Sequence, residues 1–340
     1  MIKLEDIAHL AGVSKATVSL VLNNKSGVSQ SKREEILNLV EKHQYQPLRK
    51  AKKKDSASPQ HTVRLLACNS LYTFTYNFQH LPYFNELIND FIVYAPKYSI
   101  NLLINSISID NVEVELNNLE TNQASEAIIL LGTDLPESTV ETILNMHSNI
   151  VVIDSCFDHI NNNFIAKNNF QGAYLATKYL IEHGHKSIGY AMSNQRIRNF
   201  QERQAGFKAA LKKFHLKTED FPKIIFPAHE IAPHPELLRR NQIPTAYFCD
   251  NDSIAISLIK SLQAIGMNVP EDISVIGFDN ISESKVITPE LTTIDIDRQF
   301  MVNKALEKVS TIINQSQSPE NNTQYRINAK LVVRNSVKTL

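Results

Sequence analysis

The sequence predicts an α/β protein that combines a small N-terminal unit of three helices with a larger body of two doubly wound lobes. Residues 3–47 have the spacing of three short helices, with turn and capping residues between them. From Val63 on, short apolar runs alternate with helical stretches, which is typical of parallel strands covered on both faces. These runs form two series, and each series predicts one lobe. A chain of 340 residues has room for both parts.

The N-terminal unit has the residues that a helix-turn-helix needs, in the register that it needs. A first helix is expected over residues 4–11, and Gly12 permits the tight turn that follows. Ser14 can cap the second helix, expected over 14–23, and Val18 fills the angle between the two helices. A third helix over 31–43 closes the small core. A generic amphipathic helical hairpin is the alternative, and the agreement of turn, cap and plug disfavours it.

The body contains two series of buried strands with helices between them. The first series is VRLLACN, INLLINS, EAIILLG and NIVVIDS, and the second is SIGYAMS, KIIFP, TAYFCDN and ISVIGFD. LTTIDID, a further helix and KLVVRNS finish the fold. Asn-rich stretches, among them residues 161–169, are expected to be surface loops.

Charge is distributed unevenly between the two parts. Residues 1–60 carry eleven Lys and Arg against six Asp and Glu, a net charge of +5, and because the whole chain has no net charge the remainder carries −5. A basic N-terminal unit on an acidic body fits a DNA-binding module on a carrier that does not itself bind DNA. No apolar run reaches the ~18 residues of a membrane span, and the polar N-terminus has no secretory signal. Three widely spaced cysteines indicate a reducing cytoplasm.

The segments VSKATVSLVLN, GVSQSKREEIL and YQP resemble the N-terminal domain of the LacI/GalR family of transcriptional regulators. The body segments YLIEHGHKSIGY, ERQAGFKAAL and AIGMNVPEDISVIGFDN resemble the same family, so the likeness covers nearly all of the chain. It implies that the body has the two-lobed type I periplasmic-binding-protein-like fold, in which the chain crosses between the lobes three times. The crossings are expected near 155–163, 289–294 and 318–326.

The resemblance therefore implies three parts. A helix-turn-helix DNA-binding domain spans 1–47, a hinge or linker spans 48–61, and a ligand-binding and dimerisation domain spans 62–340. The first lobe of that domain is expected at about 62–157 plus 292–320, and the second at about 158–290 plus 321–340.

Position in the helix-turn-helix assigns the expected DNA contacts. Lys15, Ala16 and Leu20 are expected to face base edges, where Lys15 can donate to guanine and the two apolar side chains can touch thymine methyl groups. The family often has Arg at the position of Leu20, so its usual guanine contact is absent. The expected phosphate contacts are Ser14, Thr17, Ser19, Asn23, Ser29 and Tyr45. For each of them, a solvated helix face or a helix cap is the alternative.

The linker departs from the family pattern. Relatives have a leucine five residues after the arginine that Arg49 matches, and this leucine wedges into the minor groove. Here the position holds Lys54, whose hydrated ammonium group is poorly suited to prying base pairs apart. Arg49 and Lys54 are instead expected to contact phosphate.

The ligand cleft is expected between the lobes, at the carboxyl ends of strands. By family position, Arg203 would bind ligand hydroxyls or a carboxylate, Asn251 ends a strand, and Asp279 suits a pair of sugar hydroxyls. The alternative is that Arg203 and Asp279 pair with each other to hold the lobe together. The weaker candidates for ligand binding are Asp154, Arg198 and, after the first strand, Asn69, Tyr72 and Phe74. For the aromatic rings of Tyr72 and Phe74, a core or dimer role is the alternative.

No catalytic, cofactor or metal motif is present. The sequence lacks P-loop, GxSxG and GxGxxG patterns, and His229 and His234 lack the spacing of zinc ligands. The expected function is thus a homodimeric transcriptional regulator, a repressor of carbohydrate-utilisation genes, that binds operator DNA and a sugar or sugar-derived effector. One alternative is a regulator controlled by a partner protein. The other, a solute-binding protein or sugar-cleft enzyme, is disfavoured by the helix-turn-helix and the absent signal peptide.

Overall fold

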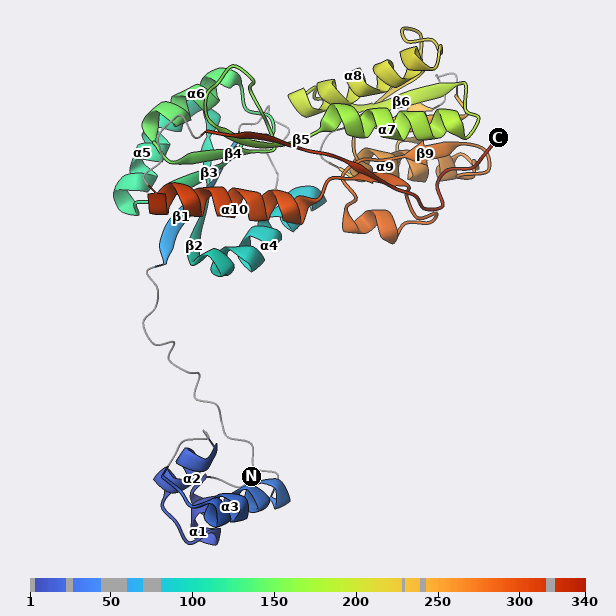
Figure 1. The fold of residues 1–340 in the computed structure, drawn as a ribbon. Coiled ribbons are helices and arrows are strands. Elements are labelled where there is room, and N and C mark those ends of the chain that lie inside the picture. The colour runs from blue at the N-terminus through green and yellow to red at the C-terminus, as the bar shows by residue number, and fades with distance from the viewer. Residues whose placement is uncertain are drawn as a thin grey trace. The chain divides into compact units, whose positions relative to one another are not determined.

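A computed structural model describes residues 4–22, 27–43, 60–69, 81–227, 230–238, 243–315 and 322–340. The chain divides into two compact units, Met1–Ser58 and Pro59–Leu340, called here the head and the body. Figure 1 shows the helices of the head and the two sheets of the body. Within the described residues, no helix is long and apolar enough to cross a membrane.

The head contains α1 (Leu4–Leu10), α2 (Lys15–Leu22) and α3 (Gln30–Lys42), close to the expected bounds. Gly12 has φ +62°, a left-handed conformation that glycine adopts without strain. The Ser14 side chain accepts a hydrogen bond from the backbone N–H of Thr17 at 3.2 Å, so it caps α2 as predicted. Val18 and Ile36 are fully buried where the three helices meet.

The first sheet of the body is parallel and has the strand order β11-β5-β4-β3-β1-β2. Helices α4 and α10 pack together on the sheet, and α5 and α6 cover a second apolar cluster on its other face. The elements of this lobe are β1 (His61–Asn69), α4 (Pro82–Tyr94), β2 (Ile100–Ser108), α5 (Val112–Asn122), β3 (Ala127–Leu131), α6 (Glu137–Met146), β4 (Ile150–Ile153), β5 (Asn163–Lys167), α10 (Arg298–Gln315) and β11 (Gln324–Ile327).

The second sheet is also parallel, with the order β7-β6-β8-β9. Its longest helices, α7 and α8, pack against each other, and α9 contacts β6, β8 and β9. The elements of this lobe are α7 (Asn169–Glu182), β6 (Ile188–Ser193), α8 (Arg198–Lys213), β7 (Lys223–Phe226), β8 (Ala246–Cys249), α9 (Asp252–Ala264) and β9 (Ser274–Ile276). Two parallel sheets covered by helices, together with the three-helix head, confirm the predicted fold class.

The crossings between the lobes differ from the predicted ones. The stretch 161–169, expected to be a loop, contains β5, and β5 pairs with β4 in the first sheet. The first crossing therefore follows Lys167 and does not lie at 155–163. Likewise β11 pairs with β5, so the chain leaves the first lobe after Ile327 rather than at 318–326. The first lobe therefore also contains residues 163–167 and 324–327. Near the second crossing, β10 (Thr293–Asp295) pairs antiparallel with β12 (Lys330–Val332), which joins two of the connecting segments.

Candidate functional site

In the head, the predicted base-reading side chains lie on one helix. Lys15 and Ala16 are exposed on α2, and Leu20 is half-buried. The Lys15 ammonium group lies 2.5 Å from a carboxylate oxygen of Glu5, and both side chains are more than half exposed. Because an exposed ion pair of this kind contributes only about 0–1 kcal/mol, Lys15 can leave Glu5 for a base edge.

The expected phosphate-binding residues lie around the start of α2 and α3. Ser14 and Ser29 are exposed, and Thr17 and Ser19 are half-buried. The Thr17 hydroxyl lies 2.9 Å from the Ser14 hydroxyl, so these two groups form one polar site at the N-terminus of α2. Helix N-termini are favourable positions for phosphate oxygens. Other predicted DNA contacts lie outside the described residues: Asn23, Tyr45, Arg49 and Lys54.

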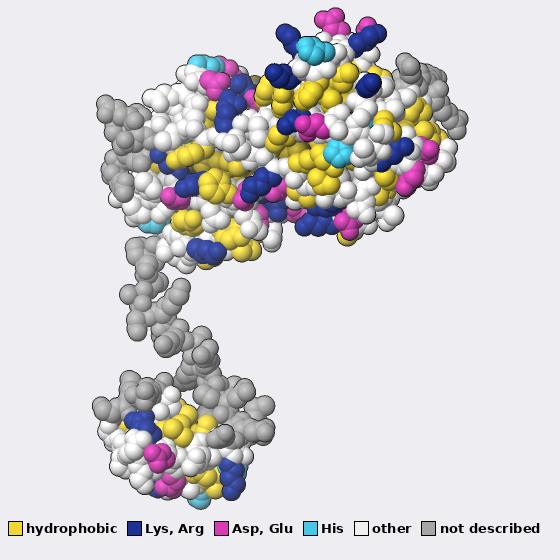
Figure 2. Space-filling view, turned by 45° about the vertical axis from the view of Figure 1, so that its right-hand side comes forward, with side chains coloured by type: hydrophobic (Ala, Val, Ile, Leu, Met, Phe, Trp, Pro, Cys, Tyr) yellow, Lys and Arg dark blue, Asp and Glu magenta, His cyan; other side chains and the backbone are white. Residues whose placement is uncertain are grey.

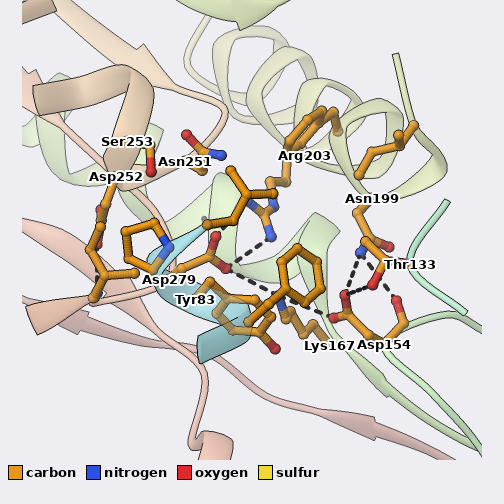
Figure 3. Close-up of a pocket in the computed structure, with 16 residues that line it drawn as sticks. Tyr83, Thr133, Asp154, Lys167, Asn199, Arg203, Asn251, Asp252, Ser253 and Asp279 are labelled. Atoms are coloured by element: carbon orange, nitrogen blue, oxygen red, sulfur yellow. Dashed lines mark hydrogen bonds and ion pairs between the residues drawn. The ribbon is translucent and has the colours of Figure 1, made fainter. Parts of the chain in front are cut away.

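In the body, the candidate site is a cleft where the carboxyl ends of both parallel sheets meet. Its polar wall comes from residues that directly follow strands, from the end of β5, and from α8, while α4 supplies an aromatic wall. The lining includes Tyr83, Thr133, Asp154, Lys167, Asn199, Arg203, Asn251, Asp252, Ser253 and Asp279, the ten residues labelled in Figure 3. Four of these, Asp154, Arg203, Asn251 and Asp279, are predicted ligand-binding residues.

Arg203 is almost completely buried and directs its guanidinium group at Asp279 (Figure 3). Its Nη2 donates to Asp279 Oδ1 at 3.1 Å, its Nε donates to Asn169 Oδ1 at 2.9 Å, and its Nη1 donates to the backbone carbonyl of Asp250. The guanidinium carbon lies 3.7 Å from the ring centroid of Phe278. The pairing of Arg203 with Asp279, which the sequence left open as an alternative to ligand binding, is therefore present.

Lys167, at the end of β5, completes this cluster. Its ammonium nitrogen lies 3.1 Å from Asp154 Oδ1 and 3.1 Å from Asp279 Oδ1. It also lies 3.6 Å from the ring centroid of Tyr83. The other carboxylate oxygen of Asp154 accepts hydrogen bonds from Thr133 at 2.7 Å and from Asn199 at 3.3 Å. These contacts hold Asp154 at φ +64°, a conformation that is uncommon outside glycine.

Asn251 serves the fold as well as the cleft. Its Oδ1 accepts a hydrogen bond from the backbone N–H of Ile254 at 2.9 Å, so it is the N-cap of α9. This leaves the side-chain amide nitrogen of Asn251 as the group that can donate to a ligand. The predicted candidates Asn69 and Arg198 are not among the residues that line the cleft. Asn69 donates to Ser106 at 2.9 Å, and the guanidinium group of Arg198 lies over the ring of Phe157. Tyr72 and Phe74 lie outside the described residues.

Asp252 is a fully buried carboxyl group in the wall of the cleft. Asp252 accepts a hydrogen bond from the Thr293 hydroxyl at 2.5 Å and from the backbone N–H of Ile281 at 3.0 Å. Burial raises the pKa of Asp252 well above its usual range, which favours the neutral acid. A Cβ added to Gly277 would lie 2.1 Å from Asp252 Oδ1, so only glycine leaves room for this carboxyl group.

On the face of the body shown in Figure 2, Lys and Arg side chains are interspersed with Asp and Glu among hydrophobic ones. Among the described residues, no group of three or more His, Cys, Asp or Glu is placed to hold a metal ion.

Two family models match the chain. Residues 3–47 match the model for bacterial regulatory proteins of the lacI family, and residues 177–337 match a periplasmic binding protein-like domain. The chain is 30% identical to the HTH-type transcriptional repressor PurR of Vibrio campbellii over 354 aligned positions, which cover all of both proteins.

Similar solved structures have the same fold. One is a complex of the transcriptional regulator CelR with cellobiose, with a TM-score of 0.70 and 21% identity, which covers 99% of this chain and 100% of that one. Another is the Lac repressor dimer bound to operator and the anti-inducer ONPF, with a TM-score of 0.69 and 21% identity, which covers 99% of each chain.

Proposed function

The chain belongs to the LacI family of bacterial regulatory proteins, and on that premise we propose that it is a repressor whose operator affinity is controlled by a small molecule in the interlobe cleft. The family is one of DNA-binding regulators, so the chain is a regulatory protein and not an enzyme. The proposed effector is a sugar or sugar derivative, and the proposed setting is a cytoplasmic homodimer. Two heads would then match the two half-sites of a symmetric operator.

The observation that carries this proposal is the buried pair of Arg203 and Asp279 in a cleft shared by the two lobes. A guanidinium donor and a carboxylate acceptor together can satisfy a vicinal pair of hydroxyl groups. Tyr83 adds an aromatic face against which a sugar ring can pack. A ligand that touches both lobes changes their separation only if it binds one arrangement more tightly than the other.

For the head, the proposal is that α2 lies in the major groove. Lys15 would read one base pair, and Ser14 and Thr17 would bind a phosphate at the helix N-terminus. The relatives support both halves of the proposal: PurR of Vibrio campbellii is named a transcriptional repressor, and CelR was solved with cellobiose.

Two measurements on the full chain test the proposal. Operator DNA, obtained by selection from random sequences, is titrated with protein and followed by fluorescence anisotropy, and a library of sugars and sugar derivatives is then added. We expect at least one compound to change the operator dissociation constant, and calorimetry to show one binding site per chain. A library without effect, combined with tight DNA binding, would instead favour control by a partner protein.

A further inference from the structure

The side chain of Lys167 lies inside the cleft and joins the two lobes. It ends β5, and Asp154 follows β4, so both belong to the first lobe, whereas Asp279 follows β9 in the second. Figure 3 shows the ammonium group between the two carboxylates, beside the ring of Tyr83. The side chain of Lys167 is only 3% exposed, so this is a buried ionic contact and not a surface pair.

The charges around the cleft are balanced. The described part of the lining contains two cations, Lys167 and Arg203, and each is paired with a carboxylate. The carboxylates are Asp154 and Asp279, both largely buried. The remaining carboxyl group of the described lining belongs to Asp252. It adds no charge when it is protonated and one negative charge when it is ionised. In either case the described lining has no net positive charge.

We propose that Lys167 is a specificity-determining residue of the effector site: its ammonium group, together with the guanidinium group of Arg203, balances the two carboxylates, so that the cleft binds an uncharged ligand and rejects the phosphorylated form of the same ligand. This inference rests on the proposed function, because it assigns a charge class to the ligand of that cleft.

The exclusion of anions follows from the pairing. A phosphate group in the cleft would need a counter-charge, and the cations that the described lining offers are Lys167 and Arg203. To bind it, one of them must leave Asp154 or Asp279, which strands a buried carboxylate without its partner. An uncharged hydroxyl or amide group can take up a hydrogen bond from the cluster without this penalty, since it changes no charge balance.

Binding of matched pairs tests the charge class. Calorimetry on the full chain would compare ribose with ribose 5-phosphate, glucose with glucose 6-phosphate, and adenosine with adenosine monophosphate. For any pair that binds, we expect the uncharged member to bind at least about 100-fold more tightly. Tighter binding of a phosphorylated member would overturn the inference. If no member of any pair binds, the result contradicts the proposed effector class, and the charge role of Lys167 is decided by the following experiment.

Chemical rescue tests the cation site without any effector. In Lys167→Ala, we expect a lower thermal unfolding midpoint, and we expect propylammonium chloride to raise that midpoint more than equal sodium chloride does. The wild type and Lys178→Ala, an exposed lysine paired with Glu182, should respond equally to the two salts. Equal effects of both salts on Lys167→Ala, or a variant as stable as the wild type, would overturn the inference.

A second variant covers the case in which Lys167→Ala does not fold. Lys167→Met keeps most of the aliphatic volume and removes the charge, so Asp154 loses the one cation that pairs with it among the described residues. Adding Asp154→Asn restores the balance, and we expect the double variant to melt at a higher temperature than Lys167→Met alone. A double variant that melts at the same or a lower temperature would show that charge balance is not what Lys167 provides.

Discussion

Replacing Arg203 with alanine should destabilise the body by about 3–5 kcal/mol, the usual effect of removing one member of a buried ion pair. Arg203 is 1% exposed, and its loss leaves Asn169 Oδ1 and the carbonyl of Asp250 without their donor. It also leaves Asp279 with Lys167 as its remaining cation. Each buried acceptor without a donor accounts for about 1–3 kcal/mol, which agrees with the range for the pair.

Tyrosine fluorescence during urea unfolding measures this effect on the body, because ten of the eleven tyrosines follow residue 60 and the chain has no tryptophan. Arg198→Ala is the matched control, since Arg198 begins the same helix but is more exposed, with a 3.5 Å pair to Glu202 and a contact over the ring of Phe157. We expect that control to change the unfolding free energy by about 1 kcal/mol or less. If Arg203→Ala changes it no more than Arg198→Ala does, the guanidinium group is not what holds the cleft wall together.

Three further changes have defined outcomes. Gly206→Ala should destabilise the body by about 1–3 kcal/mol in the same urea assay, because the new Cβ would lie 2.1 Å from the backbone oxygen of Phe170; an unchanged midpoint would contradict the close packing of α7 on α8. Burial lowers the pKa of His185 below its ordinary 6.5, so the unfolded chain binds this proton more readily. The contribution of His185 to the unfolding free energy should therefore be fully present above pH 6.5 and be lost as the pH falls below it. His185→Gln should flatten this pH dependence, as measured by urea unfolding at a series of pH values. Lys15→Ala should change the preferred base pair at one operator position by about 1–3 kcal/mol, whereas Thr17→Ala should weaken binding to all sequences alike; a binding-site selection that returns the wild-type motif for Lys15→Ala would show that the register of α2 on DNA is wrong.

Most of the fold could be predicted from local sequence. The strands of both sheets that have four or more consecutive apolar residues, such as β1 and β3, were recognised because a fully buried strand needs apolar residues on both faces. The head was recognised because turn, cap and core residues recur at fixed spacing. These signals lie within a few residues of one another, so no long-range contact is needed to interpret them.

β5 was missed because asparagines flank its short apolar run, and an Asn-rich stretch is typical of a surface loop. In NNNFIAKNN only three apolar residues lie between asparagines and Lys167. The segment is a buried strand because β4 and β11 pair with its two edges, and β11 lies about 160 residues later in the chain. No local pattern contains that information, and both errors in the lobe boundaries follow from it.

The same cause explains what was missed in the candidate site. Arg203, Asn251, Asp154 and Asp279 were predicted because they match family positions or follow recognised strands. Lys167 lay in a stretch assigned to the surface, where a lysine needs no explanation. A prediction that β5 is a strand would have placed Lys167 at its carboxyl end, at the edge of the sheet where the cleft forms.

The most direct test of the account is selection of DNA from random sequences by the full chain and by a fragment that begins at Gln60. We predict that the full chain enriches one sequence with twofold symmetry and that the fragment, which lacks the three helices of the head, enriches none. Circular dichroism of the fragment should show a folded body, so that loss of binding reports on the head alone. Enrichment of the same sequence by the fragment, or of no sequence by the full chain, would contradict the proposal that this regulator reads DNA through its head.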